Sequence, residues 1–518
     1  MAEKESEKLR MGAALSFAVI ILVIGIPLWW KTTEVYRVPL PNDRIAQLKQ
    51  FDYKISMSIY VSSLHSDSAI ILELNNTLKD TRMFNFKFKS VDLSIDRTNV
   101  MDIEKQSSIH PTVPGEILLI EMPEKYMDSN VVVGNHRSIY FATNHLSKVV
   151  KVLNTWILQS EDLLNTVQSA LTHRSINQMQ KRVVKQESRV RASPEYDLIF
   201  STISPQPEKV KFDYDQAAAV TNFFAPLISQ LSPIANHRLK SQWLYFVELG
   251  QQPKLDARNN YILTHDQLPH IISPLEKKLG SGVSTHPCLH FVTYTSLCEE
   301  APLFIKAKNG SLVDAVFSPR WGGIQLLNPS KEHCDGSKYL SPPVSKLMAT
   351  FLIQLRVLLG ITDQYNSIAG AIILPLPSVK LRDWELDVLF RFRTVEQMSL
   401  AQMTLQSLSQ LLEEISNIVI NEEVGASVSD AVYHVELGQS ALHEGNLEAA
   451  LRHSKKAYQS AENAFTHPSL LALLYFPDDQ KYAVYIPLFI PIMIPVLLSM
   501  KSVSFWKRVL RGKSEKTD

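Results

Sequence analysis

Cysteine is scarce in this sequence, and that scarcity limits what the chain can be. There are three cysteines, Cys288, Cys298 and Cys334, among 518 residues. Small secreted domains that depend on disulfides carry them at much higher density. A disulfide scaffold is therefore excluded. One bridge and one free thiol are possible, in a pairing that the sequence does not specify.

An excess of either charge is missing as well. The chain has 53 Lys and Arg residues against 52 Asp and Glu residues, which gives a net charge of +1. This balance creates no global field that would attract nucleic acid, so we expect no nucleic-acid partner. The composition is 45% hydrophobic and 20% charged, as in folded globular proteins.

The short motifs of the common enzyme classes are also lacking. No G-x-G-x-x-G, P-loop, G-x-S-x-G or H-E-x-x-H occurs. The nearest reactive cluster is His286-Pro-Cys288-Leu-His290, whose alternate residues would share one face of a strand. Pro287 interrupts it and no further ligand stands at metal-site spacing, so a structural role is favoured over a Cys–His nucleophile or a metal site. We expect no catalytic residue, no cofactor and no metal.

Two long uncharged runs stand near the ends of the chain. Residues 482–500 contain 19 residues without a charge, roughly 28 Å of helix, which can cross a bilayer core. Residues 11–30 form a second run that ends in Trp29-Trp30, directly before Lys31. Paired tryptophans suit the membrane interface, and this ending favours a retained span over a cleaved signal peptide. We expect a transmembrane helix at each run.

Prolines mark one face of the second run. Pro487, Pro491 and Pro495 stand four residues apart. Each removes a backbone N–H and leaves a carbonyl without its helical partner. In lipid such groups must be satisfied by neighbouring helices, side chains or water. The spacing therefore favours a span packed within a multi-subunit bundle over a lone anchor, and the three prolines are candidate membrane-helix contacts.

Positive charge predicts the orientation of the chain. The tail after residue 500 carries six Lys and Arg residues, whereas Asp478, Asp479 and Lys481 precede the run. Cytosolic flanks are rich in Lys and Arg, so the tail and, with two spans, both termini are expected in the cytosol. The expected parts are a cytosolic N-terminus (1–10), a transmembrane helix (11–30), a lumenal α/β region (31–392), a lumenal membrane-proximal helical region (393–481), a transmembrane helix (482–500) and a basic cytosolic tail (501–518).

The pattern between the two runs predicts an α/β ectodomain. Short or alternating apolar runs indicate strands, and apolar residues spaced three and four apart indicate helices. Strands alternating with helices are typical of an α/β layer arrangement. Strands are expected near 53–61, 84–89, 117–121, 131–133, 196–201, 243–248, 289–294 and 369–377, and helices near 149–171, 215–231 and 344–359.

The pattern becomes wholly helical from Thr394. Thr394 and Gln397 match a capping box, and apolar residues then step by three and four from Met398 to Val419. Such a seam must be buried against another element. A helical hairpin is expected over 427–465, with small residues at the spacing of one tetratricopeptide repeat.

Three polar features remain. Sequons for N-glycosylation begin at Asn75 and Asn309, and they are usable if the region is lumenal. The basic run Lys181, Arg182, Lys185, Arg189 and Arg191 could bind an anionic group, but such a run is more often a solvated linker. Asp478-Asp479 could indicate a metal-dependent glycosyltransferase, although their position favours a lumenal flank of the membrane helix.

Several unusual strings resemble the PIG-S family of glycosylphosphatidylinositol (GPI) transamidase subunits. Together they cover both ends and most of the chain after about residue 240. They are Ile26-Pro-Leu-Trp-Trp-Lys-Thr-Thr-Glu34, Leu268-Pro-His-Ile-Ile-Ser-Pro274, Ser318-Pro-Arg-Trp-Gly-Gly-Ile324, Trp384-Glu-Leu-Asp387, Ile415-Ser-Asn-Ile-Val-Ile420 and Leu474-Tyr-Phe-Pro-Asp-Asp-Gln-Lys-Tyr-Ala-Val-Tyr-Ile-Pro-Leu-Phe-Ile490.

This resemblance implies a non-catalytic scaffold subunit of the GPI transamidase complex in the endoplasmic reticulum membrane. The complex cleaves a C-terminal signal from a proprotein and joins the new carboxyl end to the ethanolamine of a GPI lipid. In the family the cysteine nucleophile and its histidine belong to the PIG-K subunit, so no catalytic residue is carried over. The implied partners are PIG-K-like, PIG-T-like and PIG-U-like subunits and the metallopeptidase-like GPI attachment subunit, with proprotein and GPI lipid as further candidate contacts.

Two other classes of function stay open at this point. A membrane-tethered, glycosyltransferase-like enzyme would use Asp478 and Asp479 and would turn over substrate without partners. A peptide-binding adaptor would use the tetratricopeptide-like hairpin and would bind a client through residues 394–470.

Overall fold

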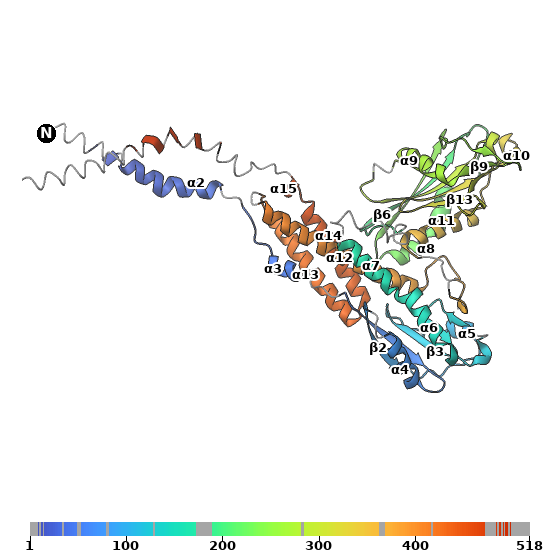
Figure 1. Cartoon of the computed structure of the whole chain (residues 1–518). Helices are drawn as coiled ribbons and strands as arrows, with labels where there is room; N and C mark the ends of the chain where they lie inside the picture. Colours follow the sequence, from blue (N-terminus) through green and yellow to red (C-terminus); the bar gives the residue numbers. More distant parts are fainter. Residues whose placement is uncertain are drawn as a thin grey trace, which may run out of the picture. The chain divides into compact units, whose positions relative to one another are not determined.

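The computed structural model describes most of the chain, and Figure 1 shows it. The described residues are 15–33, 36–48, 53–78, 82–127, 130–171, 189–280, 284–361, 368–415 and 418–471, with residues 9, 12–13, 483, 486–487, 490–491, 493–495 and 498. The chain forms two compact units. The first consists of Met1–Ala46, Thr404–Asp430 and Ser460–Asp518, and the second of Gln47–Met403 and Ala431–Gln459.

The second unit contains a six-stranded sheet in the order β15-β4-β5-β3-β1-β2. Central strand β3 alternates between two cores: Ile117 and Leu119 join the core with α4 and α6, whereas Leu118 and Ile120 cluster with Ile103 of α5. A strand buried on both faces reads as a continuous apolar run. The elements are β1 (Ile55–Ser62), α4 (Asp67–Leu78), β2 (Phe84–Ser90), α5 (Val100–Glu104), β3 (Ile117–Glu121), β4 (Val131–Val133), β5 (Ser138–Phe141), α6 (Leu146–Val152) and β15 (Ala371–Ile373).

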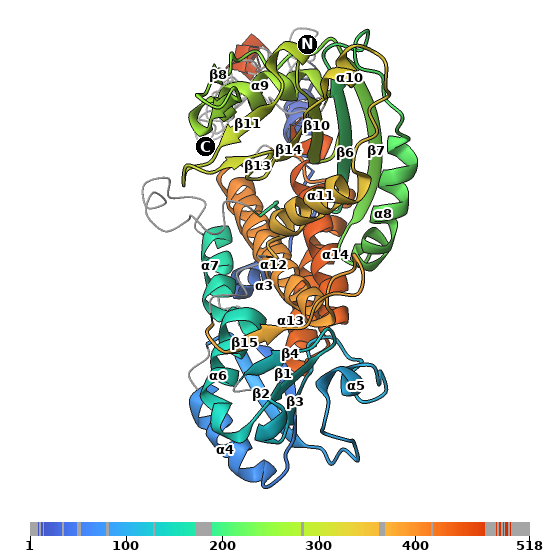
Figure 2. The same ribbon diagram turned by 90° about the vertical axis from the view of Figure 1, so that its right-hand side faces the viewer.

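A five-stranded sheet follows in the order β13-β14-β10-β6-β7. Figure 2 shows helices α8 and α11 beside this sheet, and they contact β7, β14 and each other. Helix α9 and a small sheet, β12-β11-β9-β8, contribute to a second core with β10 and β14. The main elements are β6 (Glu195–Ser204), α8 (Gln216–Leu231), β7 (Asn236–Tyr245), α9 (Leu268–Lys278), β10 (Cys288–Thr295), β13 (Ala315–Ser318), β14 (Gly322–Leu327) and α11 (Val344–Leu359), and the small strands are β8 (Lys254–Leu255), β9 (Tyr261–Thr264), β11 (Leu303–Lys306) and β12 (Leu312–Val313).

The two large sheets share one topology. In the first, β1 pairs in parallel with β2 on one side and with β3 on the other. In the second, β6 pairs in parallel with β7 on one side and with β10 on the other. Strand β3 then pairs in parallel with β5, which pairs antiparallel with the preceding strand β4. Likewise β10 pairs in parallel with β14, which pairs antiparallel with the preceding strand β13. The chain therefore folds the same arrangement twice, and the α/β class expected from the sequence is confirmed.

Edge strand β7 differs from its expected range. The apolar string predicts a strand from Trp243, whereas β7 begins at Asn236 and ends at Tyr245. Its first half is polar because Arg238 and Lys240 reach across to Asp197 on β6, at 2.9 and 2.6 Å. Charged side chains are common on edge strands, so the polar pattern conceals the strand.

The helix expected over 149–171 is two helices. Helix α6 continues as a π-helical segment, Leu153–Leu158, and ends at Gln159, whose φ is +46°. Helix α7 (Ser160–Leu171) begins directly after it. The apolar spacing survives this break because both helices bury one face, so the sequence pattern alone reads as a single helix.

Three long helices complete the described fold: α12 (Asp383–Glu414), α13 (Glu422–Glu444) and α14 (Leu447–Phe465), followed by short α15 (Pro468–Leu471). The expected hairpin is confirmed by α13 and α14. The expected seam is confirmed as far as Leu412, since Met398, Ala401, Leu405, Leu408 and Leu412 are all buried.

The helix start expected at Thr394 is wrong. Helix α12 begins at Asp383, with Asp383 and Glu385 in its first turn, and Thr394 is fully buried in its interior. Acidic residues in the first turn complement the helix dipole. The turns before Thr394 are buried nearly all round, so they show no amphipathic period that would reveal them as helix.

One disulfide forms, between Cys298 and Cys334, and Cys288 is not disulfide-bonded. The expectation of one bridge and one free thiol is confirmed. Folding decides the pairing, because Cys288 belongs to a β-strand while the other two cysteines lie in the segments after β10 and β14.

In the first unit, residues 15–33 are helical and include the π-helical turn Ile21–Gly25 and α2 (Ile26–Thr33). Large apolar side chains such as Leu15 and Val23 are exposed there. Residues 36–48 contain α3 (Asn42–Gln47), and Arg37 forms a β-bridge with Ile420. Across the described parts of the chain, no helix combines the length and apolarity needed to cross a membrane.

Candidate functional site

The carboxyl ends of β1 and β3 are the first place to look for a site. In open α/β sheets, ligands bind where the strand order changes direction, and here that point lies between β1 and β3. The buried carboxylate of Glu121 occupies it. Ser63 donates a hydrogen bond to it at 2.5 Å, Thr143 donates another, and Arg97 donates to the Glu121 carbonyl at 2.6 Å. The protein's own groups therefore fill this switch point.

Hydrogen bonding keeps Glu121 ionised. Burial acts to raise its pKa, but the hydrogen bonds from Ser63 and Thr143 outweigh burial, so the pKa lies below its ordinary value. A carboxylate held in this way is committed to the fold and is a poor proton carrier at neutral pH.

In the second large sheet an amide joins the carboxyl ends of β10 and β14. The Ser296 hydroxyl and the Leu303 N–H both donate to Asn328 Oδ1 at 2.9 Å. The Asn328 amide nitrogen donates back to the Leu303 carbonyl at 3.0 Å. Both strand-end positions are thus occupied by structural hydrogen bonds.

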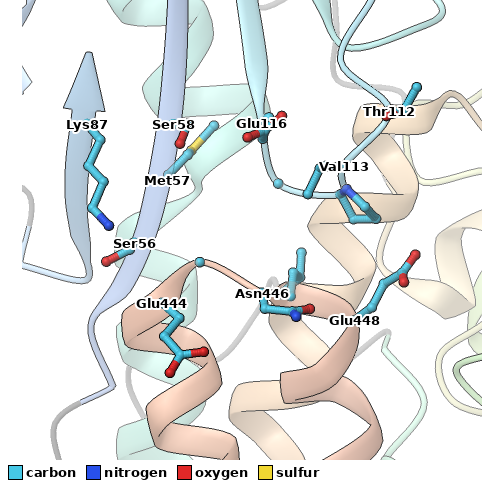
Figure 3. A pocket seen from close by; sticks show the side chains of 14 residues that line it. Ser56, Met57, Ser58, Lys87, Thr112, Val113, Glu116, Glu444, Asn446 and Glu448 are labelled. Atoms are coloured by element: carbon cyan, nitrogen blue, oxygen red, sulfur yellow. The ribbon is translucent and has the colours of Figure 1, made fainter. Parts of the chain in front are cut away.

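A pocket of about 500 Å³ lies instead where the turn between α13 and α14 meets the first sheet. Figure 3 shows its lining, which comes from β1 and β2, from the loop 112–116 and from the turn 444–448. These segments are far apart in the sequence. The site therefore exists only once the hairpin has packed against the sheet.

Glycine allows this close approach. Gly445 has a φ of +86°, and a Cβ there would lie 3.1 Å from the carbonyl oxygen of Ser56. Asn446 begins the next helix, because its side chain accepts a hydrogen bond from the Ala449 N–H at 3.0 Å. The turn thus needs a residue without a side chain, followed by a helix cap.

The pocket is predominantly acidic. Glu116, Glu444 and Glu448 line it with one lysine, Lys87 (Figure 3). Tyr60 donates a hydrogen bond to Glu116 Oε1 at 2.9 Å, which orients that carboxylate. Such a lining favours a cationic or hydrogen-bond-donating group, such as a lysine side chain of a partner. The arrangement is suited to binding.

Comparison with known proteins gives one consistent result. A family model described as phosphatidylinositol-glycan biosynthesis class S protein, PIG-S, matches residues 16–509. The chain belongs to the PIG-S family. It is 33% identical to the cattle protein named GPI-anchor transamidase component PIGS, over 98% of this chain and 97% of that one. The human protein of that name is 32% identical with the same coverage, and the fission yeast GPI transamidase component PIG-S homolog is 26% identical over 96% of this chain and 84% of its own.

In this PIG-S family member the two predicted sequons lie in a helix and in a turn. Asn75 is exposed on α4. Asn309 is exposed in the turn between β11 and β12, where its side chain accepts hydrogen bonds from the N–H and hydroxyl of Ser311 at 3.1 and 2.7 Å. Both asparagines are accessible, and their glycosylation stays a prediction.

The three predicted proline contacts lie in helical backbone. Pro487, Pro491 and Pro495 are exposed, and so are Ile486 and Ile490 beside them. That the prolines share one helix face follows from their four-residue spacing alone and stays a prediction. Contact of this face with other subunits stays a prediction.

The Cys–His cluster is built into the strand. The Cys288 thiol donates to the carbonyl of His286 at 3.5 Å, and His286 pairs with Glu195 at 3.3 Å. His290 is buried against Trp321, with ring centroids 5.3 Å apart. Burial raises the pKa of the Cys288 thiol, which disfavours the nucleophilic thiolate. These contacts support the structural role.

Part of the basic run is not a solvated linker. Lys181, Arg182 and Lys185 lie outside the described residues, as do Asp478 and Asp479. Arg189 stacks its guanidinium over Phe392 at 3.8 Å, and burial lowers the pKa of Arg189 to about 10.

The linker interpretation is therefore wrong for Arg189. Its partner is an aromatic ring of α12, about two hundred residues later in the chain, which the local sequence cannot reveal.

Proposed function

We propose that this chain is a subunit of the GPI transamidase complex. One observation carries the proposal: the chain matches, over 98% of its length and 97% of theirs, relatives that are named components of that transamidase. We further propose that it acts as a scaffold and leaves catalysis to another subunit.

The described site geometry supports a scaffold role. The switch point of the first large sheet is filled by hydrogen-bonded Glu121, and Asn328 closes the ends of β10 and β14 in the second. The Cys288 thiol faces a backbone carbonyl. Glu116, Glu444 and Glu448 line a pocket suited to holding a partner's cationic group.

We also propose a two-pass protein of the endoplasmic reticulum membrane, with cytosolic termini and a lumenal ectodomain. The uncharged runs 11–30 and 482–500 and the basic tail support this topology. The bridge between Cys298 and Cys334 supports an oxidising compartment for the ectodomain. Tethering at both ends would raise the ectodomain's effective concentration beside its partners.

Two surfaces are proposed to contact the other subunits. One is the proline face of residues 482–500. The other is the helical segment 394–465, whose hairpin tip forms the acidic pocket. The proposed partners are PIG-K-like, PIG-T-like and PIG-U-like subunits and the metallopeptidase-like GPI attachment subunit.

The proposed function is tested by asking whether this chain can replace the class S component of a cell. Cells lacking their own class S component would express the tagged chain, and surface display of a GPI-anchored reporter would be measured with subunit co-purification from gentle detergent. Restored display and recovery of a PIG-K-like subunit support the proposal. A chain that is expressed at normal level, purifies alone and restores no display contradicts it.

The topology is tested in the same cells. Asn75→Gln and Asn309→Gln should each remove one endoglycosidase-sensitive increment of mass if both sites carry glycans. Tags at either terminus should be digested by protease added to sealed microsomes. Protection of the tags, with the ectodomain digested, would reverse the proposed orientation.

A peptide-binding adaptor is the second candidate, and the acidic pocket at the hairpin tip favours it. Site-specific crosslinkers placed at Asn446 in the full chain would report the occupant. Crosslinks to a proprotein would support the adaptor, crosslinks to another subunit would support the scaffold, and Glu444→Gln with Glu448→Gln should weaken either.

A further inference from the structure

Three potential metal ligands converge beside the first sheet. Glu104 ends α5, His110 lies in the loop that follows, and His136 lies in the hairpin between β4 and β5. One ligand atom from each lies within 4.8 Å of the other two. The two imidazole rings are stacked, with centroids 4.8 Å apart and planes inclined by 25°. Zinc bonds of about 2.1 Å place tetrahedral ligand atoms about 3.4 Å apart, so small side-chain rotations would close the site.

Each histidine already holds a partner on its other nitrogen. His136 Nδ1 lies 2.9 Å from Asp383 Oδ2, and His110 Nδ1 lies 2.5 Å from the Ser138 hydroxyl. Metal-binding histidines usually have their second nitrogen oriented by a carboxylate or another polar group in this way. In each histidine Nε2 is therefore the nitrogen available to a metal ion.

A buried nitrogen without a hydrogen bond points to a missing ligand. The exposed fraction of His110 is 5%, and its Nε2 has no hydrogen-bond partner. A buried polar atom left without a hydrogen bond destabilises the fold. A metal ion bonded to Nε2 would remove that destabilisation.

The carboxylate is fixed in place by the surrounding backbone. Glu104 Oε1 accepts the N–H groups of Asn135 and His136 at 2.6 and 2.8 Å. Glu104 Oε2 accepts the Tyr140 hydroxyl at 2.6 Å and keeps a further lone pair. The carboxylate is thus oriented as second-sphere hydrogen bonds orient metal ligands.

An entry path exists. Glu104, His136 and Asp383 line a cavity of about 730 Å³, whose other walls come from α8 and from the segment 375–382. A cation can reach the cluster from this side. A water molecule can then occupy the coordination position that faces the cavity.

We propose that Glu104, His110 and His136 bind a zinc ion, with a fourth position open to this cavity. Two imidazoles and one carboxylate with an open position form a donor set that zinc takes in proteins. The site would fasten the β4–β5 hairpin to α5 and the loop after it. This proposal extends beyond the scaffold function and does not depend on it.

The test uses the full chain purified in detergent, stripped with a chelator and titrated with zinc against a chromophoric competitor. One zinc per chain is expected. Cobalt added instead of zinc should give visible absorption typical of nitrogen and oxygen ligands, displaced by one equivalent of zinc. His136→Ala should weaken zinc binding by at least tenfold, and Asp383→Asn by about 10- to 100-fold through lost orientation of His136.

A second stacked histidine pair provides the matched control. His434 and His453 have ring centroids 5.1 Å apart and planes inclined by 28°, but they belong to no metal-ligand group found among the described residues. His453→Ala should leave zinc binding unchanged. His136 is partly exposed, so its truncation should preserve the fold, and circular dichroism would verify this.

Absence of stoichiometric zinc and of a cobalt spectrum in the wild-type chain would overturn the proposal. So would full zinc binding by a correctly folded His136→Ala chain.

Discussion

Arg137 and Asp387 lie 250 positions apart in the sequence and form a bidentate ion pair in the fold. Arg137 donates to the two carboxylate oxygens of Asp387 at 2.7 and 2.9 Å. The exposed fractions of the two side chains are 8% and 2%. The Gly115 N–H also donates to Asp387, at 2.9 Å. This pair ties α12 to the first sheet beside the acidic pocket.

Removing one partner of that pair should be costly. Asp387→Ala would leave a buried guanidinium uncompensated, and the free energy of unfolding should fall by about 3–5 kcal/mol. Denaturant titration of the purified chain measures this. The control is Asp314→Ala, because Asp314 pairs with Lys346 at 2.6 Å on the surface, where such a pair contributes about 0–1 kcal/mol. Equal losses in the two variants would contradict the assigned role of Asp387.

Gly322 should tolerate no side chain. A Cβ at this position would lie 1.9 Å from the carbonyl oxygen of His290 on the neighbouring strand, and its φ is +142°. Gly322→Ala should therefore separate β10 from β14 and give little folded chain. Gly250→Ala is the matched control, since Gly250 also has a positive φ, +71°, but nothing lies within 4 Å of its Cβ position.

The Gly322→Ala and Gly250→Ala chains are compared by the yield of monodisperse protein and by its resistance to protease. The control should lose only about 1–2 kcal/mol from backbone strain. A Gly322→Ala chain as stable as the control would show that the two strands lie farther apart than the structure places them.

Two buried histidines should make the chain sensitive to acid. Burial lowers the pKa of His237 and of His290 to about 4, from an ordinary value of 6.5. Between these values the unfolded chain binds protons that the folded chain does not, so the free energy of unfolding falls as the pH drops from 6.5 to 4. Above pH 6.5 each neutral histidine makes its full contribution to the free energy of unfolding, which is about 3 kcal/mol higher per histidine than at pH 4.

Denaturant midpoints measured from pH 7 to pH 4.5 test this dependence. His290→Gln removes one titrating group and should flatten the curve. His270→Gln changes an exposed histidine of α9 and should leave the slope as it was. Parallel curves for all three chains would contradict the assignment to His290.

The proline face should matter for assembly. Replacing Pro487, Pro491 and Pro495 together by leucine restores the backbone donors but alters the face that we propose for helix contacts, so co-purification of the other subunits should weaken. The control replaces Ile486, Ile490 and Ile494 by valine, which keeps an uncharged run of equal length. Unchanged subunit recovery and transamidase activity in the proline variant would exclude this face as a contact.

Local patterns were enough to predict most of the strands and helices. Strand β3 shows four consecutive apolar residues before Glu121 because it is buried on both faces, and α8 and α11 lie within a residue of their expected ends. The pattern failed where burial surrounds a helix, as in α12 before Thr394, and where an edge strand faces water, as in the first half of β7. In both cases neighbours remove the periodicity that marks an element.

The candidate sites were far less predictable. The hairpin over 427–465 was predicted, but the pocket at its turn also needs β1 and the loop 112–116. Glu104, His110 and His136 show no metal-site spacing, since the last two are 26 positions apart. Only the hairpin between β4 and β5 brings them together.

The sequence by itself determined the class of this protein and its family, because α/β layering, uncharged runs and the strings shared with PIG-S proteins are properties of contiguous residues. Tertiary structure alone decided the cysteine pairing, the burial of Arg189 against Phe392, the acidic pocket and the histidine cluster. Each of these joins segments that are distant in the chain, and their contact is fixed by how sheets and helices pack, which no local spacing records.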